Sequence, residues 1–156
     1  MTIPDKLRED LKESILRRES NRVTILRLLL SEIKNAEISS RTTLSDDKVI
    51  DVISTEVKHH RESIEAYKKG NRDDLVALEE QELSLLLSYL PEQIGNDEII
   101  VIVHETISAV GAMGMNDRGK VMSQLMPQLK GKANGKEVSD IVNGILLGIE
   151  SQENSK

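Results

Sequence analysis

The stretch Ile50–Tyr67, I-D-V-I-S-T-E-V-K-H-H-R-E-S-I-E-A-Y, decides the fold class. Its seam positions recur at alternating spacings of three and four residues, which predicts a long helix with one narrow buried face. Gly70-Asn71 then predicts a left-handed helix end. A second seam follows this turn, and the two seams together predict a long antiparallel helical hairpin. The seam positions are Ile50, Ile53, Val57, His60, Ile64 and Tyr67 on the first helix and Leu75, Leu78, Glu82, Leu85 and Tyr89 on the second.

Two more helices are predicted before the hairpin. An apolar residue at every fourth position predicts a helix over residues 2–16, with Thr2 or Asp5 as its cap. A denser apolar pattern predicts another helix over residues 19–38. Pro91 disfavours helical geometry at the residue before it, and Gly95 follows closely. We therefore predict a helical N-terminal domain over residues 1–92. The four apolar positions of the helix predicted over residues 2–16 are Ile3, Leu7, Leu11 and Ile15.

Three shorter helices are predicted after this boundary. Asn96-Asp97-Glu98 is a favourable acidic start for a helix to Val110, although the β-branched run at residues 99–103 has strand propensity. Asn116 is expected to open the next helix. Asn134, with an acidic residue three positions later, is typical of the capping box of a last helix. The prediction is a small three-helix domain over residues 96–149 and a frayed tail over residues 150–156.

Composition supports an all-α protein. The 156 residues include no Phe, no Trp and two Tyr, so the core must be built from Leu, Ile, Val and Met. There is no Cys, which excludes disulfides, thiolate metal sites and a cysteine nucleophile. The N-terminus has no apolar segment typical of secretion, and no apolar run is long enough to cross a membrane. We therefore expect a soluble, cytoplasmic protein without membrane contact.

The segment Arg118–Lys136 carries five basic residues and no acidic residue, whereas the whole chain has a net charge of -6. Such a local cationic segment indicates a polyanionic partner. The alternative is that these residues only complement helix dipoles and keep the surface soluble. The candidate nucleic-acid-binding residues are Arg118, Lys120, Lys130, Lys132 and Lys136.

No catalytic residue, metal site or cofactor is predicted. The stretch G-M-N-D-R-G-K at residues 114–120 resembles a phosphate-binding loop, but Val121 stands where Ser or Thr is required. The three histidines, His59, His60 and His104, lack the spacing of metal ligands on one helix. We expect His60 to be a buried, hydrogen-bonded imidazole, and the seam carboxylate Glu82 to pair with a base such as Arg61 or Arg72.

The two tyrosines are too few to stack single-stranded bases, whereas contacts to the backbone of a folded RNA need only basic side chains and helix N-termini. A folded RNA is therefore the form of nucleic acid that the composition favours.

Several stretches together resemble the YqeY family, small bacterial proteins with a GatB/YqeY domain. They are R-E-S-I-E-A-Y-K-K-G-N-R-D-D-L at residues 61–75, Y-L-P-E-Q at 89–93, G-K-V-M at 119–122, L-M-P at 125–127 and K-G-K-A-N-G at 130–135. The resemblance implies an all-helical N-terminal part and a three-helix C-terminal domain similar to the tail of the B subunit of the tRNA-dependent amidotransferase, which touches tRNA. Two positions depart from the expected pattern, since Arg118 stands for Met and Asn134 for Asp.

The resemblance and the basic segment together predict a non-catalytic helical module that binds tRNA or an amidotransferase-like, translation-linked complex. No activating core or glutaminase resembling that enzyme is present, so a glutamine-dependent carbon–nitrogen ligase activity is the least favoured alternative. A protein–protein adaptor is the second alternative. It would use the acidic hairpin or the surface formed by Met113, Met115, Met122 and Met126 to bind a protein partner in tRNA or amino-acid metabolism.

Overall fold

The computed structural model describes residues 1–154, which form seven α helices, one short 3₁₀ helix and no strand. The prediction of an all-α fold is confirmed. The chain divides after Pro91 into two compact units. The helices are α1 (Ile3–Leu16), α2 (Ser20–Ser40), α3 (Asp46–Lys69), α4 (Asp73–Leu87), α5 (Asn96–Val110), the 3₁₀ helix η1 (Met115–Asp117), α6 (Arg118–Leu129) and α7 (Gly135–Asn154).

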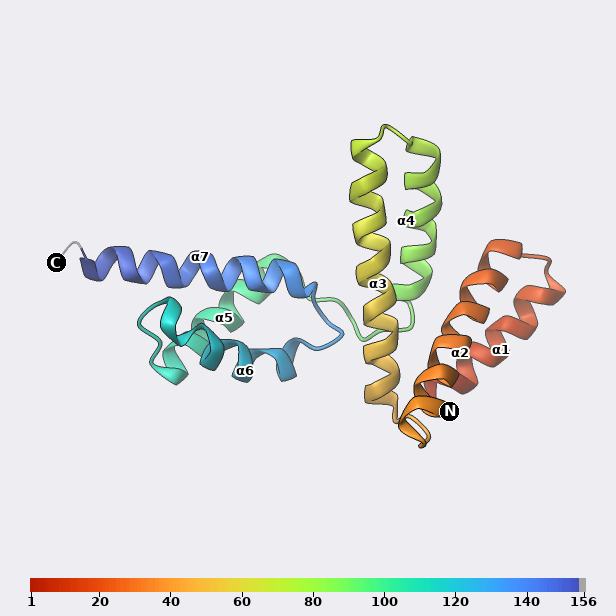
Figure 1. The fold of residues 1–156 in the computed structure, drawn as a ribbon, viewed down its shortest axis with the longest axis horizontal. Helices are drawn as coiled ribbons and strands as arrows, with labels where there is room; N and C mark the ends of the chain where they lie inside the picture. Colours follow the sequence, from red (N-terminus) through yellow and green to blue (C-terminus); the bar gives the residue numbers. More distant parts are fainter. Residues whose placement is uncertain (155–156) are drawn as a thin grey trace. The chain divides into compact units, whose positions relative to one another are not determined.

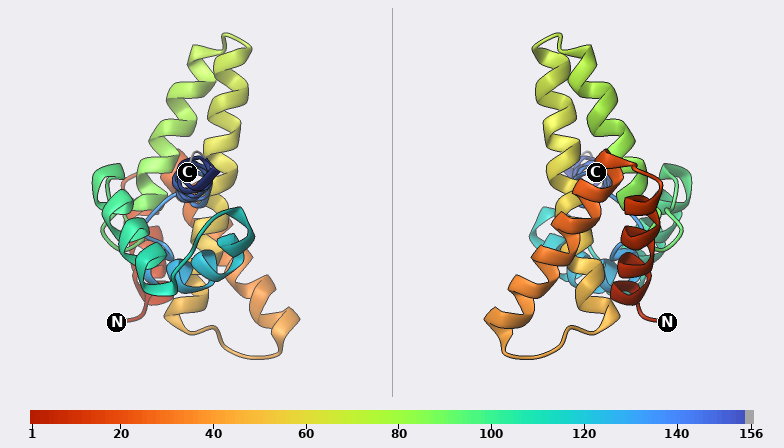
Figure 2. Two further views of the ribbon diagram at one scale, coloured as in Figure 1. Left: turned by 90° about the vertical axis from the view of Figure 1, so that its left-hand side faces the viewer. Right: turned by 90° about the vertical axis from the view of Figure 1, so that its right-hand side faces the viewer.

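The first unit consists of two helix pairs, α1 with α2 and α3 with α4, each lying side by side (Figure 1). The views from both sides also show α4 alongside α3 (Figure 2). The first half of α3 and the end of α4 pack with α1 and α2 around one core. Its buried members are Leu7, Ile25, Leu26, Leu29, Ile33, Val49, Ile53, Val57, Leu86 and Tyr89.

The hairpin turn differs in detail from the predicted one. Gly70 has a φ of -86°, and the left-handed residue is Asn71, with a φ of 54°. Asn is among the residues that adopt this conformation most readily, because its short polar side chain can bond locally. The start of α3 also differs, since Val49 is fully buried whereas Ile50 is only partly buried.

The first helix begins with the predicted cap. The Thr2 hydroxyl accepts a hydrogen bond from the Asp5 amide, and the Asp5 carboxylate accepts one from the Thr2 amide. Near its end, the predicted apolar position Ile15 is 48% exposed and Ser14 is buried instead. The Ser14 hydroxyl donates to the Asp10 carbonyl at 2.7 Å, so the buried polar group is satisfied within its own helix.

The second unit packs α5, α6 and α7 around a separate core. The β-branched run at residues 99–103 is helical as predicted, and its Ile99 and Val103 are fully buried. The core combines these residues with Ile107, Ala112, Val121, Leu125, Leu129, Val138, Val142 and Leu146.

Two expectations for this unit need correction. The helix expected to open at Asn116 begins at Arg118, after the 3₁₀ turn η1. The last helix runs to Asn154, so residues 150–154 of the expected frayed tail are helical, whereas residues 155 and 156 lie outside the described residues.

Among the described residues, no single helix is both long and apolar enough to cross a membrane. α5 taken together with residues Met115–Leu129 meets the length and composition of a span, and this pair is bent by 92°. The buried apolar side chains of both helices belong to the second core.

Candidate functional site

The basic segment covers α6, the loop after it and the first turn of α7. Lys120 is exposed on the first turn of α6, Lys130 and Lys132 are exposed in the loop, and Lys136 is exposed at the start of α7. Four of the five predicted residues therefore present their ammonium groups at the surface of the second unit. The acidic residues Glu137 and Asp140 follow directly on α7 and limit the extent of this positive surface.

The Arg118 guanidinium is hydrogen-bonded to two side chains of the last helix. Its Nε donates to Asn143 Oδ1 at 2.7 Å, and one terminal nitrogen donates to the Ser139 hydroxyl at 2.6 Å. Both partners lie on α7, so Arg118 ties the first residue of α6 to the last helix. The side chain is partly buried.

The loop that carries Lys130 and Lys132 is held by the residues just after the boundary between the two units. The Gln93 amide side chain donates to the Gly131 carbonyl at 2.7 Å, and the Ile94 amide donates to the Lys132 carbonyl at 2.8 Å. Asn134 then caps α7, because its side-chain oxygen accepts from the Lys136 amide at 3.1 Å. Fixed backbone on both sides reduces the conformational entropy that a partner would have to remove on binding.

The stretch that resembles a phosphate-binding loop joins two helices, so no strand precedes it. One of its backbone amides, and the amide of the residue just before it, are bonded to carboxylates of the same chain. The Met115 amide donates to Glu150 at 2.6 Å, and the Met113 amide donates to Asp117 at 2.9 Å. A Cβ at the buried Gly114 would lie 2.4 Å from a Glu150 carboxylate oxygen, so a larger residue here would have to displace the Glu150 side chain.

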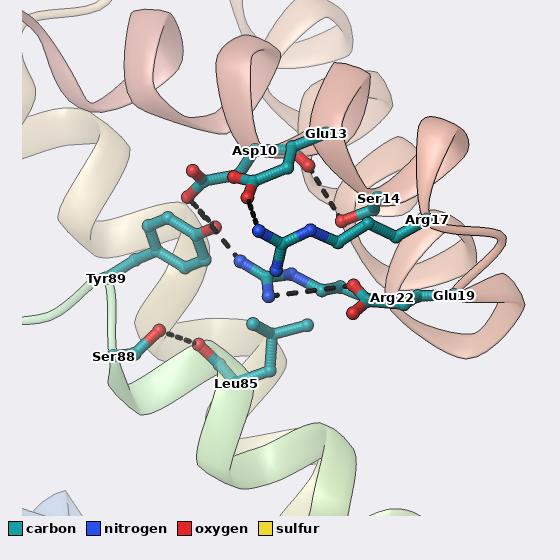
Figure 3. Close-up of polar contacts among 9 residues, drawn as sticks. All are labelled: Asp10, Glu13, Ser14, Arg17, Glu19, Arg22, Leu85, Ser88 and Tyr89. Atoms are coloured by element: carbon teal, nitrogen blue, oxygen red, sulfur yellow. Dashed lines mark hydrogen bonds and ion pairs between the residues drawn. The ribbon is translucent and has the colours of Figure 1, made fainter.

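A second polar site lies where α1, α2 and the end of α4 meet (Figure 3). The Tyr89 hydroxyl donates to the Asp10 carboxylate. The Arg22 guanidinium lies 4.0 Å from Asp10 and 3.8 Å from Glu19. A cavity of about 480 Å³ opens nearby, lined by residues 18–22 and Gln81.

The Tyr89 phenol is strongly held in its neutral form. Burial raises its pKa most, the hydrogen bond to Asp10 and the charge of that carboxylate raise it further, and Arg22 lowers it by a smaller amount. The ammonium group of Lys6 lies 5.5 Å from the centre of the ring, within cation–π range.

The third site is a cluster of His60, Glu79 and Glu82 between α3 and α4. His60 Nε2 lies 2.9 Å from a Glu82 oxygen and 3.6 Å from a Glu79 oxygen. His60 Nδ1 bonds the Glu56 carbonyl at 2.9 Å. His60 is therefore the buried, hydrogen-bonded histidine that the sequence predicts. The prediction that Glu82 pairs with Arg61 or Arg72 is wrong, because its partner is His60.

Opposing effects set the pKa of His60. Burial lowers this pKa, but the Glu56 and Glu82 hydrogen bonds and the charges of Glu79 and Glu82 raise it more, so its net value is above normal. The pKa of Glu79 is raised chiefly by burial, partly offset by His60 and reinforced by Glu82. Both shifts reflect three ionisable groups that share a partly buried space.

The methionines proposed as an adaptor surface are not equivalent. Met113 and Met126 are 57% and 38% exposed. Met115 and Met122 instead pack against the second core. Two of these four methionines therefore pack inside the second unit and do not form an exposed surface.

The model of the family described as Yqey-like protein matches residues 4–146, nearly the whole chain. The chain belongs to this family. The YqeY-like assignment confirms the resemblance seen in the motifs, and it fits the helical structure of both units.

Three fungal proteins are among the curated relatives of this YqeY-like chain. The chain is 39% identical over 85 residues to a protein of Vanderwaltozyma polyspora named Altered inheritance of mitochondria protein 41, mitochondrial. This match covers 54% of this chain and 46% of that protein. It is 28% identical over 130 residues to the protein of the same name in Pyrenophora tritici-repentis, and this match covers 82% of this chain and 71% of that protein. An uncharacterized protein of Schizosaccharomyces pombe is 32% identical over 90 residues, and this match covers 58% of this chain and 73% of that protein.

These relatives contradict the expectation of a bacterial, cytoplasmic protein, because they are eukaryotic and the names of two of the three place them in mitochondria. The bacterial part of this expectation rested on the resemblance to the YqeY family, and the cytoplasmic part rested on the lack of a membrane-spanning run and of an apolar secretory segment. Mitochondrial targeting sequences are instead amphipathic and rich in arginine, so the lack of such a segment did not bear on them. The chain spans about half the length of most of the mitochondrial relatives.

The site that sequence reasoning missed in this YqeY-like chain is the three-residue cluster in the hairpin. The spacing rule for metal-binding histidines applies to residues on one helix, whereas His60 comes from α3 and both carboxylates from α4. A signal was present, since His60 and Glu82 were both seam positions and Asn71 lies midway between them in the sequence.

Proposed function

We propose that this chain is a non-catalytic helical module that binds the phosphate backbone of a folded RNA, with tRNA as the candidate RNA. The interface consists of Lys120, Lys130, Lys132 and Lys136. The observation that carries the proposal is that these four lysines are exposed within a segment that lacks any acidic residue on an acidic chain. Arg118 is left out, because its guanidinium is occupied by Asn143 and Ser139.

The chemistry favours shape and backbone contacts over base recognition. Lysine ammonium groups bind phosphates as mobile point charges, and the four lysines are not accompanied by aromatic side chains that would stack bases. Positioning contacts of this kind carry little sequence information. The fixed loop at residues 130–134 supports binding by presenting two of the lysines on backbone that is already ordered.

The names of the relatives add a location to this proposal. We infer that the module acts on mitochondrial RNA or on a mitochondrial complex that handles it, because a relative that matches 82% of the chain carries a mitochondrial name. Imaging of the full-length tagged protein with a mitochondrial marker tests the location separately from RNA binding. A signal outside mitochondria would remove this part of the proposal.

The RNA proposal is tested by titrating tRNA into three proteins at two salt concentrations. They are the wild type, a triple variant Lys130→Glu, Lys132→Glu and Lys136→Glu, and a charge-matched control. The control carries Lys12→Glu, Lys34→Glu and Lys58→Glu, which change exposed lysines of the first unit. Both variants alter the net charge equally, so a difference between them depends on position.

We expect the wild type to bind with a dissociation constant of about 10⁻⁴–10⁻⁶ M at physiological salt. Three or four phosphate contacts predict a log–log salt slope with a magnitude of about 2–4. The triple variant in the basic segment should lose binding, whereas the control should keep most of it. Absence of salt-sensitive binding by the wild type, or equal losses in both variants, would contradict the proposal and favour a protein partner instead.

A further inference from the structure

We propose that His60, Glu79 and Glu82 form a binding site for one divalent transition-metal ion of the Zn²⁺ class, held between α3 and α4. The three residues come from both helices of the hairpin, so an ion at this place would cross-link them. The site is independent of the basic segment, which lies in the second unit.

The distances between the ligand atoms suit such an ion. One nitrogen of His60 and one oxygen of each carboxylate all lie within 4.8 Å of one another. The separations from His60 Nε2 are 2.9 Å to Glu82 and 3.6 Å to Glu79. Zn–N and Zn–O bonds of about 2.0–2.2 Å place tetrahedral ligand atoms roughly 3.4 Å apart. The two measured separations bracket this value, so small side-chain shifts bring the three atoms around one ion.

The other nitrogen of His60 has the partner that a metal-binding histidine requires. Nδ1 lies 2.9 Å from the Glu56 carbonyl, which can only accept, so Nδ1 carries the proton of this bond. The bond fixes the ring orientation and directs Nε2 toward the two carboxylates. Ligating histidines in proteins are usually held by such a bond to a carbonyl or carboxylate. Nε2 therefore faces the carboxylates either with a second proton or with a lone pair available to a cation.

Charge balance favours the cation. A neutral imidazole, two carboxylates and a divalent ion sum to zero, whereas an imidazolium with two carboxylates leaves one negative charge uncompensated. The side chains of His60, Glu79 and Glu82 are only 9%, 20% and 17% exposed, so an uncompensated charge is costly at this place.

The donor set narrows the kind of metal. One imidazole with two carboxylates suits Zn²⁺ and related first-row ions better than Ca²⁺ or Mg²⁺, which prefer oxygen ligands alone. Three protein ligands leave a fourth position for water or for an atom from a partner, as in open zinc sites. The partial exposure of both carboxylates gives that position access to solvent.

The test is a titration of ZnCl₂ into chelator-treated, full-length protein, repeated with Co²⁺ so that its visible absorption reports the ligand geometry. Glu79→Gln and Glu82→Gln each remove one charged ligand and keep the side-chain shape. Glu80→Gln is the control for a carboxylate on the same helix. His59→Gln is the control for a surface histidine, since its Nδ1 lies 3.8 Å from Glu56 on the exposed side of α3. Circular dichroism checks that all variants keep their helix content.

We expect the wild type to bind one ion per chain and to melt at a higher temperature with Zn²⁺ than without it. Glu79→Gln and Glu82→Gln should each weaken binding by at least about tenfold, the loss seen even for groups that only support a ligand. The two controls should bind as the wild type does. Failure of the wild type to bind Zn²⁺, or equal losses in the control variants, would overturn the proposal.

Discussion

The Tyr89 hydroxyl donates a hydrogen bond to the Asp10 carboxylate, and this bond joins residues that lie 79 positions apart in the sequence (Figure 3). Tyr89 follows the end of α4, whereas Asp10 lies in the middle of α1. The ring of Tyr89 is part of the first core, so Tyr89 joins α1 to the end of α4 through both apolar packing and its hydroxyl bond.

Tyr89→Phe should destabilise the first unit, because the change removes a hydrogen bond to a charged acceptor and keeps the ring. The expected loss in the free energy of unfolding is about 1.5–3 kcal/mol. Urea unfolding followed by circular dichroism measures it. Tyr67→Phe is the matched control on the only other tyrosine, and it should stay within about 0.5 kcal/mol of the wild type. Equal losses in the two variants would argue against the Asp10 bond as the cause.

The same residue predicts a loss of stability at alkaline pH. The pKa of Tyr89 is raised in the folded protein, so the neutral phenol is favoured there relative to the unfolded chain. Its contribution is complete below the unfolded pKa of about 10 and is lost as the pH rises above it. The stability difference between the wild type and Tyr89→Phe should therefore stay constant below about pH 10 and narrow progressively from about pH 10 upward. A difference that stays constant as the pH rises above about 10 would contradict the prediction.

Gly114→Ala should destabilise the second unit through Glu150. The new Cβ forces the Glu150 carboxylate away and breaks its bond to the Met115 amide, at an expected cost of about 1–2 kcal/mol. In a Glu150→Ala background the clash is absent, so Gly114→Ala should then cost much less. A double-mutant cycle by urea unfolding measures this coupling. Additive losses would show that another contact restricts residue 114.

Replacement by Ala should lower stability at Arg118 and should weaken the salt dependence of tRNA binding at Lys120. Arg118→Ala removes both hydrogen bonds to α7 and should cost about 1–3 kcal/mol of stability, with little change in the salt slope of tRNA binding. Lys120→Ala should leave stability within about 0.5 kcal/mol of the wild type. It should also lower the salt slope by about 0.7–0.9. A loss of stability in Lys120→Ala together with a lower salt slope in Arg118→Ala would contradict this assignment of roles.

The boundary between the two units should be open to limited proteolysis at Glu92. Residues 92–95 have no regular secondary structure, whereas Gln93 and Ile94 are bonded to the loop of the second unit. A glutamate-specific protease should therefore release fragments 1–92 and 93–156 before it cuts within helices. Mass spectrometry identifies the fragments. Early cleavage inside α3 or α4 would contradict the proposed domain boundaries.

The sequence by itself determined the helices, because helix formation depends on local periodicity and caps. The spacing of the seam from Ile53 to Ile64 and the capping pair Thr2 and Asp5 act within a few turns of chain, and all of them behave as predicted. The β-branched run at residues 99–103 is helical because its apolar side chains follow the helical period despite their strand propensity.

Only the tertiary structure decided which polar groups meet. His60 rather than Arg61 or Arg72 partners Glu82, and Arg118 reaches Asn143 and Ser139. Side-chain length and sequence spacing do not reveal such pairs, since the partners lie on different helices and their distance depends on the register of packing. Burial then sets their chemistry, because a carboxylate or imidazole removed from water must find its counter-charge among the groups that packing brings within reach.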